Sequence, residues 1–199
     1  MKIITVNGAE LSRSELVAAG ELLFLTDEEI YPTAFGTAEN MGKVFPYLAS
    51  IKGNMFEGKN LLVAKADGAI AGVLVGCRNA KWAPGAVEKA FTACGLPVPS
   101  GAADAEKHYF CYEAEHESGD YVLCLCVSPL FRRQGIGKIL LTNYLSDKTE
   151  ATLECLRSNP VAMALYEACG FVNIAEYDGY SAPGKPCVAV CKMLYKANK

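Results

Sequence analysis

The segment with the clearest chemical potential is a glycine-rich run of basic and polar residues, Arg132-Arg133-Gln134-Gly135-Ile136-Gly137, followed by Lys138. Glycines at 135 and 137 let the backbone approach a ligand closely and take angles that other residues avoid. The apolar periodicity from residue 136 to about 146 predicts a helix, whose first turn offers unpaired N–H groups and a positive dipole end. Because three basic side chains add positive charge there, the run predicts a site for a phosphate or pyrophosphate.

Three phosphate-binding patterns can be compared with this run. A Walker loop requires Gly-x-x-x-x-Gly-Lys-Ser/Thr, and here Lys138 lacks the following Ser or Thr and the earlier glycine. A dinucleotide fingerprint requires Gly-x-Gly-x-x-Gly, and Leu140 occupies its third glycine position. The remaining pattern, Arg/Gln-x-x-Gly-x-Gly/Ala, is satisfied by Arg132, Gly135 and Gly137.

This pattern resembles the acyl-CoA-binding motif of the GNAT superfamily of N-acetyltransferases. Four further parts of the family's sequence pattern are matched in order: Val127-Ser128-Pro129, Asn159, Leu165-Tyr166 and Gly170-Phe171. The resemblance covers residues 120–195 and extends more loosely over 61–76. Residues 78–108 are outside the common pattern.

The resemblance implies a set of contacts with acetyl-CoA as cosubstrate, without a metal. The pyrophosphate would lie on the loop, mainly on its backbone N–H groups: Arg132, Arg133, Gln134, Gly135, Ile136, Gly137 and Lys138. Leu125 and Val127 would bond the pantetheine arm through main-chain atoms, where the fourth and fifth strands splay apart. Asn159 would reach the amide groups of the cofactor or serve only as a helix cap, and the two roles are compatible.

The resemblance also implies catalytic roles. Tyr166 is at the family position that protonates the departing thiolate; the alternative is a tyrosine packed under the sheet. Many family members keep a Glu on the fourth strand, but Tyr121–Val127 contains none. Glu113 and Glu115 are candidates for the general base because period two places them on one face of a strand, or they are simply solvated. Cys126 as a covalent acyl carrier is a less favoured option, because the family usually transfers the group directly.

The implied function is an N-acetyltransferase that moves an acetyl (acyl) group from acetyl-CoA directly to a primary amine of a small molecule or peptide. A non-catalytic acyl-CoA sensor on the same fold is the alternative. An unrelated nucleotide-binding α/β protein is a third interpretation, disfavoured by the missing Walker and dinucleotide elements. Acidic residues at 113, 115, 117 and 120 favour a cationic acceptor, and either a monomer or a homodimer is compatible with the sequence.

The remaining sequence predicts the elements that position this segment. Strands are expected at 2–6, at 61–66 and 69–76 around an Asp-Gly turn, at 109–115, 121–127 and 151–156, and at 171–180 and 187–195. Helices are expected at 9–25, started near Ser12 or Ser14, at 38–51, which Pro46 would break or kink, at 84–94 and between Asn159 and Gly170.

These elements and the resemblance predict one domain over residues 1–199, of mixed α/β (α+β-like) class. Its GNAT-type fold would have a central, mostly antiparallel sheet splayed between the fourth and fifth strands, with helices on both faces. Residues 78–108 form an insertion, either a surface excursion anchored by Trp82 or a flap beside the substrate site.

Composition restricts the other function classes. A net charge of −3, from 19 basic and 22 acidic residues, argues against nucleic acid as the main ligand. No apolar run approaches the ~20 residues of a membrane helix, and no signal peptide is expected. The nine cysteines are odd in number, form no C-x-x-C pair and stand mostly in apolar runs, which predicts free thiols in a reduced cytoplasmic protein and no metal site.

Overall fold

The computed structural model describes residues 1–111, 119–179 and 188–197. Seven strands form one sheet in the order β1-β2-β3-β4-β5-β7-β6. The strands are β1 (Ile3–Asn7), β2 (Leu61–Ala66), β3 (Ala69–Arg78), β4 (Asp120–Val127), β5 (Glu150–Leu156), β6 (Phe171–Gly179) and β7 (Val188–Lys196). The helices are α1 (Arg13–Leu23), α2 (Ile30–Phe35), α3 (Ala38–Ser50), α4 (Ala86–Ala93), α5 (Ala102–Ala105), α7 (Ile136–Leu145) and α8 (Pro160–Ala168).

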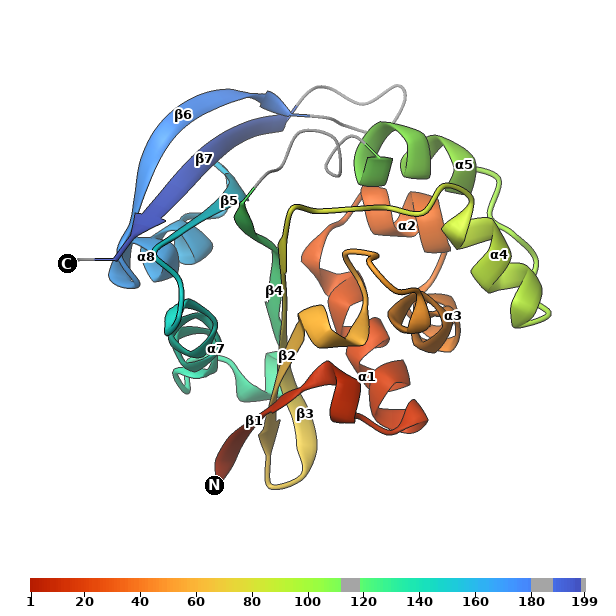
Figure 1. The fold of residues 1–199 in the computed structure, drawn as a ribbon, viewed down its shortest axis with the longest axis horizontal. Helices are drawn as coiled ribbons and strands as arrows, with labels where there is room; N and C mark the ends of the chain where they lie inside the picture. The colour runs from red at the N-terminus through yellow and green to blue at the C-terminus, as the bar shows by residue number, and fades with distance from the viewer. Residues whose placement is uncertain (112–118, 180–187, 198–199) are drawn as a thin grey trace.

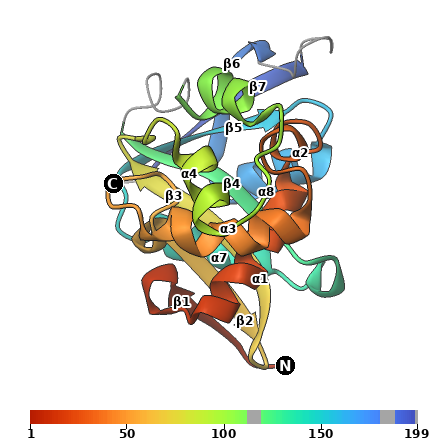
Figure 2. The same cartoon turned by 90° about the vertical axis from the view of Figure 1, so that its right-hand side faces the viewer.

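The sheet separates two groups of helices. Helices α1 to α5 lie on one side and α7 and α8 on the other, as two perpendicular views show (Figures 1 and 2). Each side has its own apolar core: Phe35, Phe45 and Phe56 are fully buried on the first, and Leu140 and Met193 on the second. The mixed α/β class and the helices on both faces are therefore confirmed.

The sheet is antiparallel except at one pairing, between β4 and β5. That parallel pairing holds at only two positions, Tyr121 with Thr152 and Val122 with Leu153. Beyond them β4 runs on to Val127 without pairing with β5, so the two strands diverge. The predicted splay between the fourth and fifth strands is confirmed, and it opens the sheet in its middle.

A β-bulge bends β4 just where the divergence begins. Val75 pairs with Cys124 and Gly76 with Val122, so Leu123 is an extra residue on β4. Bulges of this kind increase the local twist and redirect side chains. Here Leu123 and Cys124, adjacent on β4, both pack in the core on the side of α1, so strict alternation of β4 side chains is interrupted.

Most of the predicted helices are found, and Pro46 does not end α3. The helix continues from Ala38 to Ser50, with Thr37 capping its N-terminus. A proline inside a helix removes one backbone hydrogen bond. Phe45 and Leu48 on either side of Pro46 are fully buried, and this packing outweighs the lost bond.

The prediction of a strand that starts at Tyr109 is wrong for the described residues. Glu106–Phe110 form a π-helical turn, and Cys111 continues the helical backbone. Phe110 is fully buried and stacks on Trp82 with ring centroids 4.5 Å apart. The apolar residues here pack in an aromatic core between helices. Local alternation alone does not distinguish such a helical segment from a strand. Helices α2 and α5 were also not predicted.

Residues 78–108 pack on the side of the sheet that carries α1 to α3. Trp82 is 8% exposed and lies in the aromatic cluster with Phe56 and Phe110. Glu106, 6% exposed, accepts hydrogen bonds from the backbone N–H groups of Gly85 and Val87 and so caps α4. This anchoring agrees with the surface-excursion alternative; a flap role for the segment stays a prediction.

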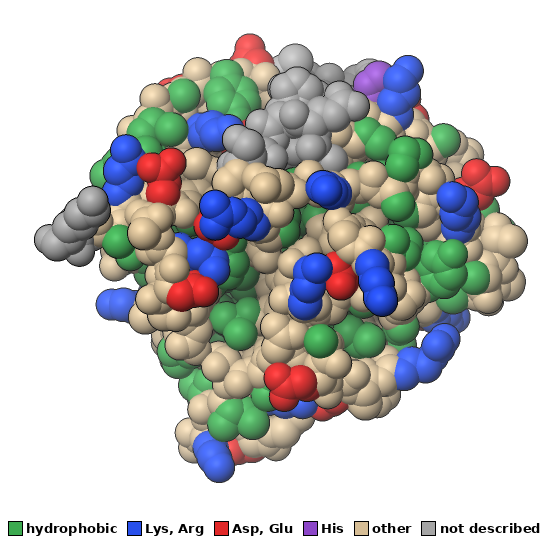
Figure 3. Space-filling view, viewed as in Figure 1, with side chains coloured by type: hydrophobic (Ala, Val, Ile, Leu, Met, Phe, Trp, Pro, Cys, Tyr) green, Lys and Arg blue, Asp and Glu red, His purple; other side chains and the backbone are tan. Residues whose placement is uncertain are grey.

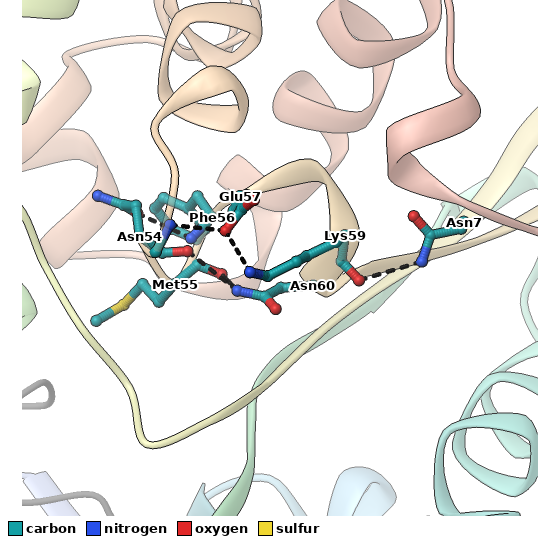
Figure 4. A network of polar contacts seen from close by, with 8 residues as sticks. Asn7, Asn54, Met55, Phe56, Glu57, Lys59 and Asn60 are labelled. Atoms are coloured by element: carbon teal, nitrogen blue, oxygen red, sulfur yellow. Dashed lines mark hydrogen bonds and ion pairs between the residues drawn. The ribbon is translucent and has the colours of Figure 1, made fainter.

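A polar network closes the connection from α3 to β2 (Figure 4). The amide of Asn60 donates to the carbonyls of Asn54 and Met55, and the amide of Asn7 donates to the carbonyl of Lys59. Glu57 pairs with Lys59 at 2.8 Å, which holds the pKa of that carboxyl below its usual value. These bonds fix the end of β1 against the entry to β2.

The start of α1 carries an ion pair that makes stability depend on pH. Ser12 and Glu15 form a capping box, and Lys65 of β2 contacts Glu15 Oε1 at 2.5 Å. The Lys65 ammonium and the Ser12 donors lower the pKa of Glu15 from 4.5 to about 2. Because the pKa is lower in the folded protein, the charged form stabilises the fold above about pH 4.5, and this is lost as pH falls through about 2.

We expect Glu15→Gln to lower the free energy of unfolding by about 1 kcal/mol at pH 7, since Gln keeps the capping geometry but not the charge. Urea unfolding of both proteins at pH 7, 5 and 3.5 measures the difference. The difference in free energy of unfolding between the two proteins should become smaller between pH 5 and pH 3.5, because the wild type loses the stabilisation from the Glu15 carboxylate. A difference that is equal at all three pH values would contradict the role of this carboxylate.

Candidate active site

The divergence of β4 and β5 opens a cleft of about 190 Å³. Four parts of the fold line it. The α1–α2 connection and α2 contribute Thr26, Asp27, Ile30 and Tyr31. Strand β4 contributes Tyr121, Leu123, Cys124 and Leu125. Strand β5 and α8 contribute Glu154, Cys155, Leu156, Asn159 and Tyr166, and the remaining wall is made by Tyr109, Val188 and Val190.

Tyr166 is held on α8 with its ring under the sheet and its hydroxyl at the cleft. The side chain is 8% exposed and packs edge-to-face on Phe171, with centroids 6.0 Å apart. Burial raises the pKa of Tyr166 above its ordinary value. Among the described residues its hydroxyl has no hydrogen-bond partner, so it can donate its proton to a bound group. Tyr166 is therefore packed under the sheet and also lines the cleft, and its role as the acid stays a prediction.

The glycine-rich loop takes the conformation that its sequence suggests. A short 3-10 turn, Pro129–Phe131, ends β4, and Gly135 then starts α7 in the left-handed region at φ 78°. Arg133 has a positive φ of 61° as well. The side chains of Arg132, Arg133 and Gln134 are exposed, as is that of Lys138. The loop therefore presents the first turn of α7 and three cations to solvent, which suits a pyrophosphate.

Gly137 marks a close approach between the two helices of this side. A Cβ added there would lie 2.9 Å from Leu165 Cδ2 on α8, closer than real contacts allow. It would also lie 3.6 Å from Leu125 Cδ2 and 3.7 Å from Val127 Cγ2. The glycine thus lets α7 begin against both α8 and β4, and this brings the loop to the end of the cleft.

The other predicted cofactor residues are also near this end. Leu125 lines the cleft. The carbonyl of Val127 accepts a hydrogen bond from Arg132 Nε at 3.3 Å, which ties the loop to β4. Asn159 caps α8 by accepting from the N–H of Ala162 at 3.0 Å, and it lines the cleft as well. The capping role is found, and contacts of Leu125, Val127 and Asn159 with a cofactor stay predictions.

The predicted general bases, Glu113 and Glu115, lie outside the described residues. Two other carboxylates line the cleft instead, Asp27 and Glu154, and the sequence interpretation did not select either. Asp27 accepts hydrogen bonds through Oδ1 from the backbone N–H groups of Glu29, at 2.8 Å, and of Ile30. The Tyr177 hydroxyl of β6 donates to Glu154 Oε1.

A sequence signal for these two residues existed. Asp27 opens the acidic run Asp27-Glu28-Glu29 just before a helix, a position typical of a capping carboxylate. Glu154 alternates with the buried residues Leu153 and Cys155 on β5, so it had to face the other side of the strand. The sequence did not indicate that the Asp27 and Glu154 side chains line the same cleft.

The thiols near the cleft are poor nucleophiles. Burial raises the pKa of Cys124, which lines the cleft, to about 12. It raises the pKa of Cys126 to about 11, and this side chain packs in the core on the side of α1. Because the thiolate is the reactive form, a thiol with such a pKa is almost entirely unreactive near neutral pH. This geometry favours direct transfer over an acyl-cysteine intermediate.

Basic and acidic side chains are interspersed over the face seen in Figure 3. In residues 1–111, 119–179 and 188–197, no group of three or more His, Cys, Asp or Glu side chains is placed to hold a metal ion. Over the same ranges, no helix is both long and apolar enough to cross a membrane. All eight described cysteines are free thiols.

Comparison with known proteins agrees with this geometry. Residues 101–173 match the sequence model of the family described as acetyltransferase (GNAT) domain. The search of curated proteins returned no match. Among solved structures, a protein described as an acetyltransferase shares 20% identity, with a TM-score of 0.68 over 98% of this chain and 100% of that one.

Two further structures have the same fold. An N-acetyltransferase from Staphylococcus aureus Mu50 is 13% identical, with a TM-score of 0.63 over 96% of this chain and 99% of its own. A chain of the NatC complex bound to Gag peptide and CoA is 16% identical, with a TM-score of 0.60 over 100% of both chains. The splayed sheet with its loop at the start of α7 is thus the fold of GNAT acetyltransferases. Residues 101–173 thus match the GNAT acetyltransferase family, and the whole chain has the fold of such acetyltransferases.

Proposed function

We propose that the protein is an N-acetyltransferase that transfers an acetyl group from acetyl-CoA directly to a primary amine. The observation that carries this proposal is the cleft between β4 and β5, which has the glycine-rich loop near one end and Tyr166 in its wall. The family match supports the cosubstrate, because GNAT proteins use acetyl-CoA.

The loop residues 132–138 would bind the pyrophosphate of acetyl-CoA. Their N–H groups at the start of α7 favour negative charge, and Arg132, Arg133 and Lys138 add charge that is open to solvent. The pantetheine arm would then run along β4 past Val127 and Leu125 into the cleft, with Asn159 on its other side. This path brings the thioester to the part of the cleft that Tyr166 lines.

Catalysis would come mainly from holding the thioester and a neutral amine together in the cleft. Attack of the amine nitrogen on the thioester carbonyl forms the new C–N bond, and the C–S bond then breaks. Tyr166 gives its phenolic proton to the departing thiolate of CoA. The amine loses its proton to a carboxylate or to water; Glu113 and Glu115 remain candidates, and Glu154 is a further carboxylate that lines the described cleft.

The first test is binding of acetyl-CoA to the wild-type protein. At a concentration 100 times its Kd, acetyl-CoA should stabilise the fold by about 2.7 kcal/mol, seen as a rise in melting temperature. ATP and NAD⁺ at the same concentration serve as controls and should leave the melting temperature unchanged. No rise with acetyl-CoA at millimolar concentration would contradict the proposal.

A non-catalytic acyl-CoA sensor is the second candidate, since it would use the same loop and cleft. Release of free CoA thiol in the presence of a panel of primary amines separates the two. An enzyme releases thiol at a rate that depends on amine concentration and on Tyr166. A sensor binds acetyl-CoA equally well but releases no thiol with any amine, whether or not the Tyr166 hydroxyl is present.

A further inference from the structure

The cleft contains an acidic side chain whose orientation is fixed by the backbone. Asp27 Oδ1 accepts both hydrogen bonds from the N–H groups at the start of α2, those of Glu29 and Ile30. Its second oxygen, Oδ2, takes part in neither bond. Since the residue lines the cleft, the carboxylate is held rigidly there with one oxygen available to a ligand.

The side chains around Asp27 are mainly apolar, and the charged side chains among the described residues of the cleft are acidic. Ile30 and Tyr31 beside it are buried, and Leu156 and Val188 also line the cleft. Among the described residues of the lining, Asp27 and Glu154 are the charged side chains, and neither Lys, Arg nor His is present. A carboxylate in such surroundings is stabilised by an opposite charge. Since no described residue of the lining supplies that charge, a cationic group of a bound ligand would stabilise the Asp27 carboxylate.

A second observation also points to a polar ligand in this cleft. The Tyr166 side chain is 8% exposed and lines the same cleft, and no hydrogen bond joins its hydroxyl to another described residue. Tyr166 and Asp27 therefore present two polar groups to one apolar space, from opposite helical sides of the sheet.

The chemistry of the proposed reaction adds one condition. An amine that attacks a thioester must be neutral at that moment, so the reacting nitrogen carries no charge to offset a carboxylate. A positive group that pairs with the carboxylate throughout the reaction is then a second group, elsewhere on the acceptor. We infer that the acceptor is a primary amine with a second, non-reacting cationic group, and that Asp27 binds this group through Oδ2. This inference rests on the proposed function.

The chain offers a matched variant and a control. Asp27→Asn keeps an oxygen that accepts the two N–H groups of α2, but it removes the negative charge. Glu28→Gln removes a charge from the next residue, which is exposed and does not line the cleft. The first variant should alter acceptor binding, and the second should not.

The probes are 1,3-diaminopropane, 1,4-diaminobutane and 1,5-diaminopentane, titrated calorimetrically into the CoA-bound protein. We expect the wild type to bind at least one diamine, and Asp27→Asn to bind it at least about tenfold more weakly, as for a lost charge-assisted hydrogen bond. Glu28→Gln should retain the wild-type affinity. If the wild type binds none of the three, or if Asp27→Asn binds as well as the wild type, the inference is overturned.

Turnover gives a readout that a merely structural change would not reproduce. With the diamine, Asp27→Asn should raise KM about tenfold and leave kcat within about threefold, because the second cation is remote from the reacting atoms. With 4-amino-1-butanol, which has no second cation, KM should be the same in both proteins. Equal effects on both acceptors would contradict the inference. Stabilisation by acetyl-CoA is measured beforehand: its absence defeats the proposed function, whereas its presence with no effect of Asp27 defeats only this inference.

Discussion

The variant Tyr166→Phe is expected to lower kcat for amine acetylation by about 10²-fold or more, the usual contribution of a positioned general acid. The departing thiolate of CoA then has to take its proton from water. Affinity for acetyl-CoA should change little, because the Tyr166 ring keeps its contact with Phe171. Stability should not fall, since among the described residues the hydroxyl has no hydrogen-bond partner to lose. Steady-state kinetics with saturating acetyl-CoA, together with thermal melts, measure all three quantities.

The pH dependence adds a second check on Tyr166. Burial raises its pKa above the ordinary value of 10, so the phenol stays protonated and able to donate through the whole neutral and mildly alkaline range. The wild-type rate should therefore show no loss from Tyr166 ionisation below about pH 10.

A control tyrosine is available on α7. The Tyr144 hydroxyl donates to the carbonyl of Tyr121 at 3.2 Å and is not among the residues that line the cleft. Tyr144→Phe should cost about 1 kcal/mol of stability and leave kcat unchanged. If Tyr166→Phe keeps kcat within threefold of the wild type, or if Tyr144→Phe lowers kcat as much, Tyr166 is not the acid.

The second large effect is expected at Gly135, the N-cap of α7. Gly135→Asp should abolish the stabilisation by acetyl-CoA, because it places a carboxylate where the pyrophosphate is expected. Gly135 is exposed with φ 78°, and a Cβ built there meets no atom within 4 Å. Asp and Asn tolerate this left-handed region better than other side chains. The change is therefore mainly one of charge.

Gly135→Asn is the isosteric control for Gly135→Asp. Both variants introduce the same backbone strain, so their melting temperatures without ligand should be similar. Thermal melts with increasing acetyl-CoA should then show a shift for the wild type and for Gly135→Asn, and none for Gly135→Asp. A full rise in melting temperature with acetyl-CoA for Gly135→Asp would show that the pyrophosphate does not bind at this loop.

The elements that sequence reasoning predicted well are those with strong local signals. Helix α8 has an Asn cap, a proline at its first position and Gly170 after its end, and each of these acts within one turn of the chain. The β2–β3 hairpin follows from its Asp67-Gly68 turn, with positive φ at both residues. The loop before α7 was predicted for the same reason, since Gly135 has the left-handed conformation that glycine permits.

The sequence interpretation failed where a long-range contact overrides the local pattern. The alternation that suggested a strand from Tyr109 belongs to a π-helical turn, because Phe110 stacks on Trp82, 28 residues away in the chain. Pro46 was expected to interrupt α3, yet burial of Phe45 and Leu48 keeps the helix continuous. In both cases tertiary packing outweighs a local preference of a few kcal/mol.

By itself, the sequence predicted the resemblance to the GNAT family, the loop that would hold a pyrophosphate and the tyrosine that follows it, because these depend on short spacings within one segment. Only the tertiary structure showed which of the described carboxylates line the cleft between β4 and β5. Asp27 and Glu154 are 127 positions apart in the chain. They face one space because β4 and β5 separate after a two-residue pairing, and that divergence depends on the register of the whole sheet.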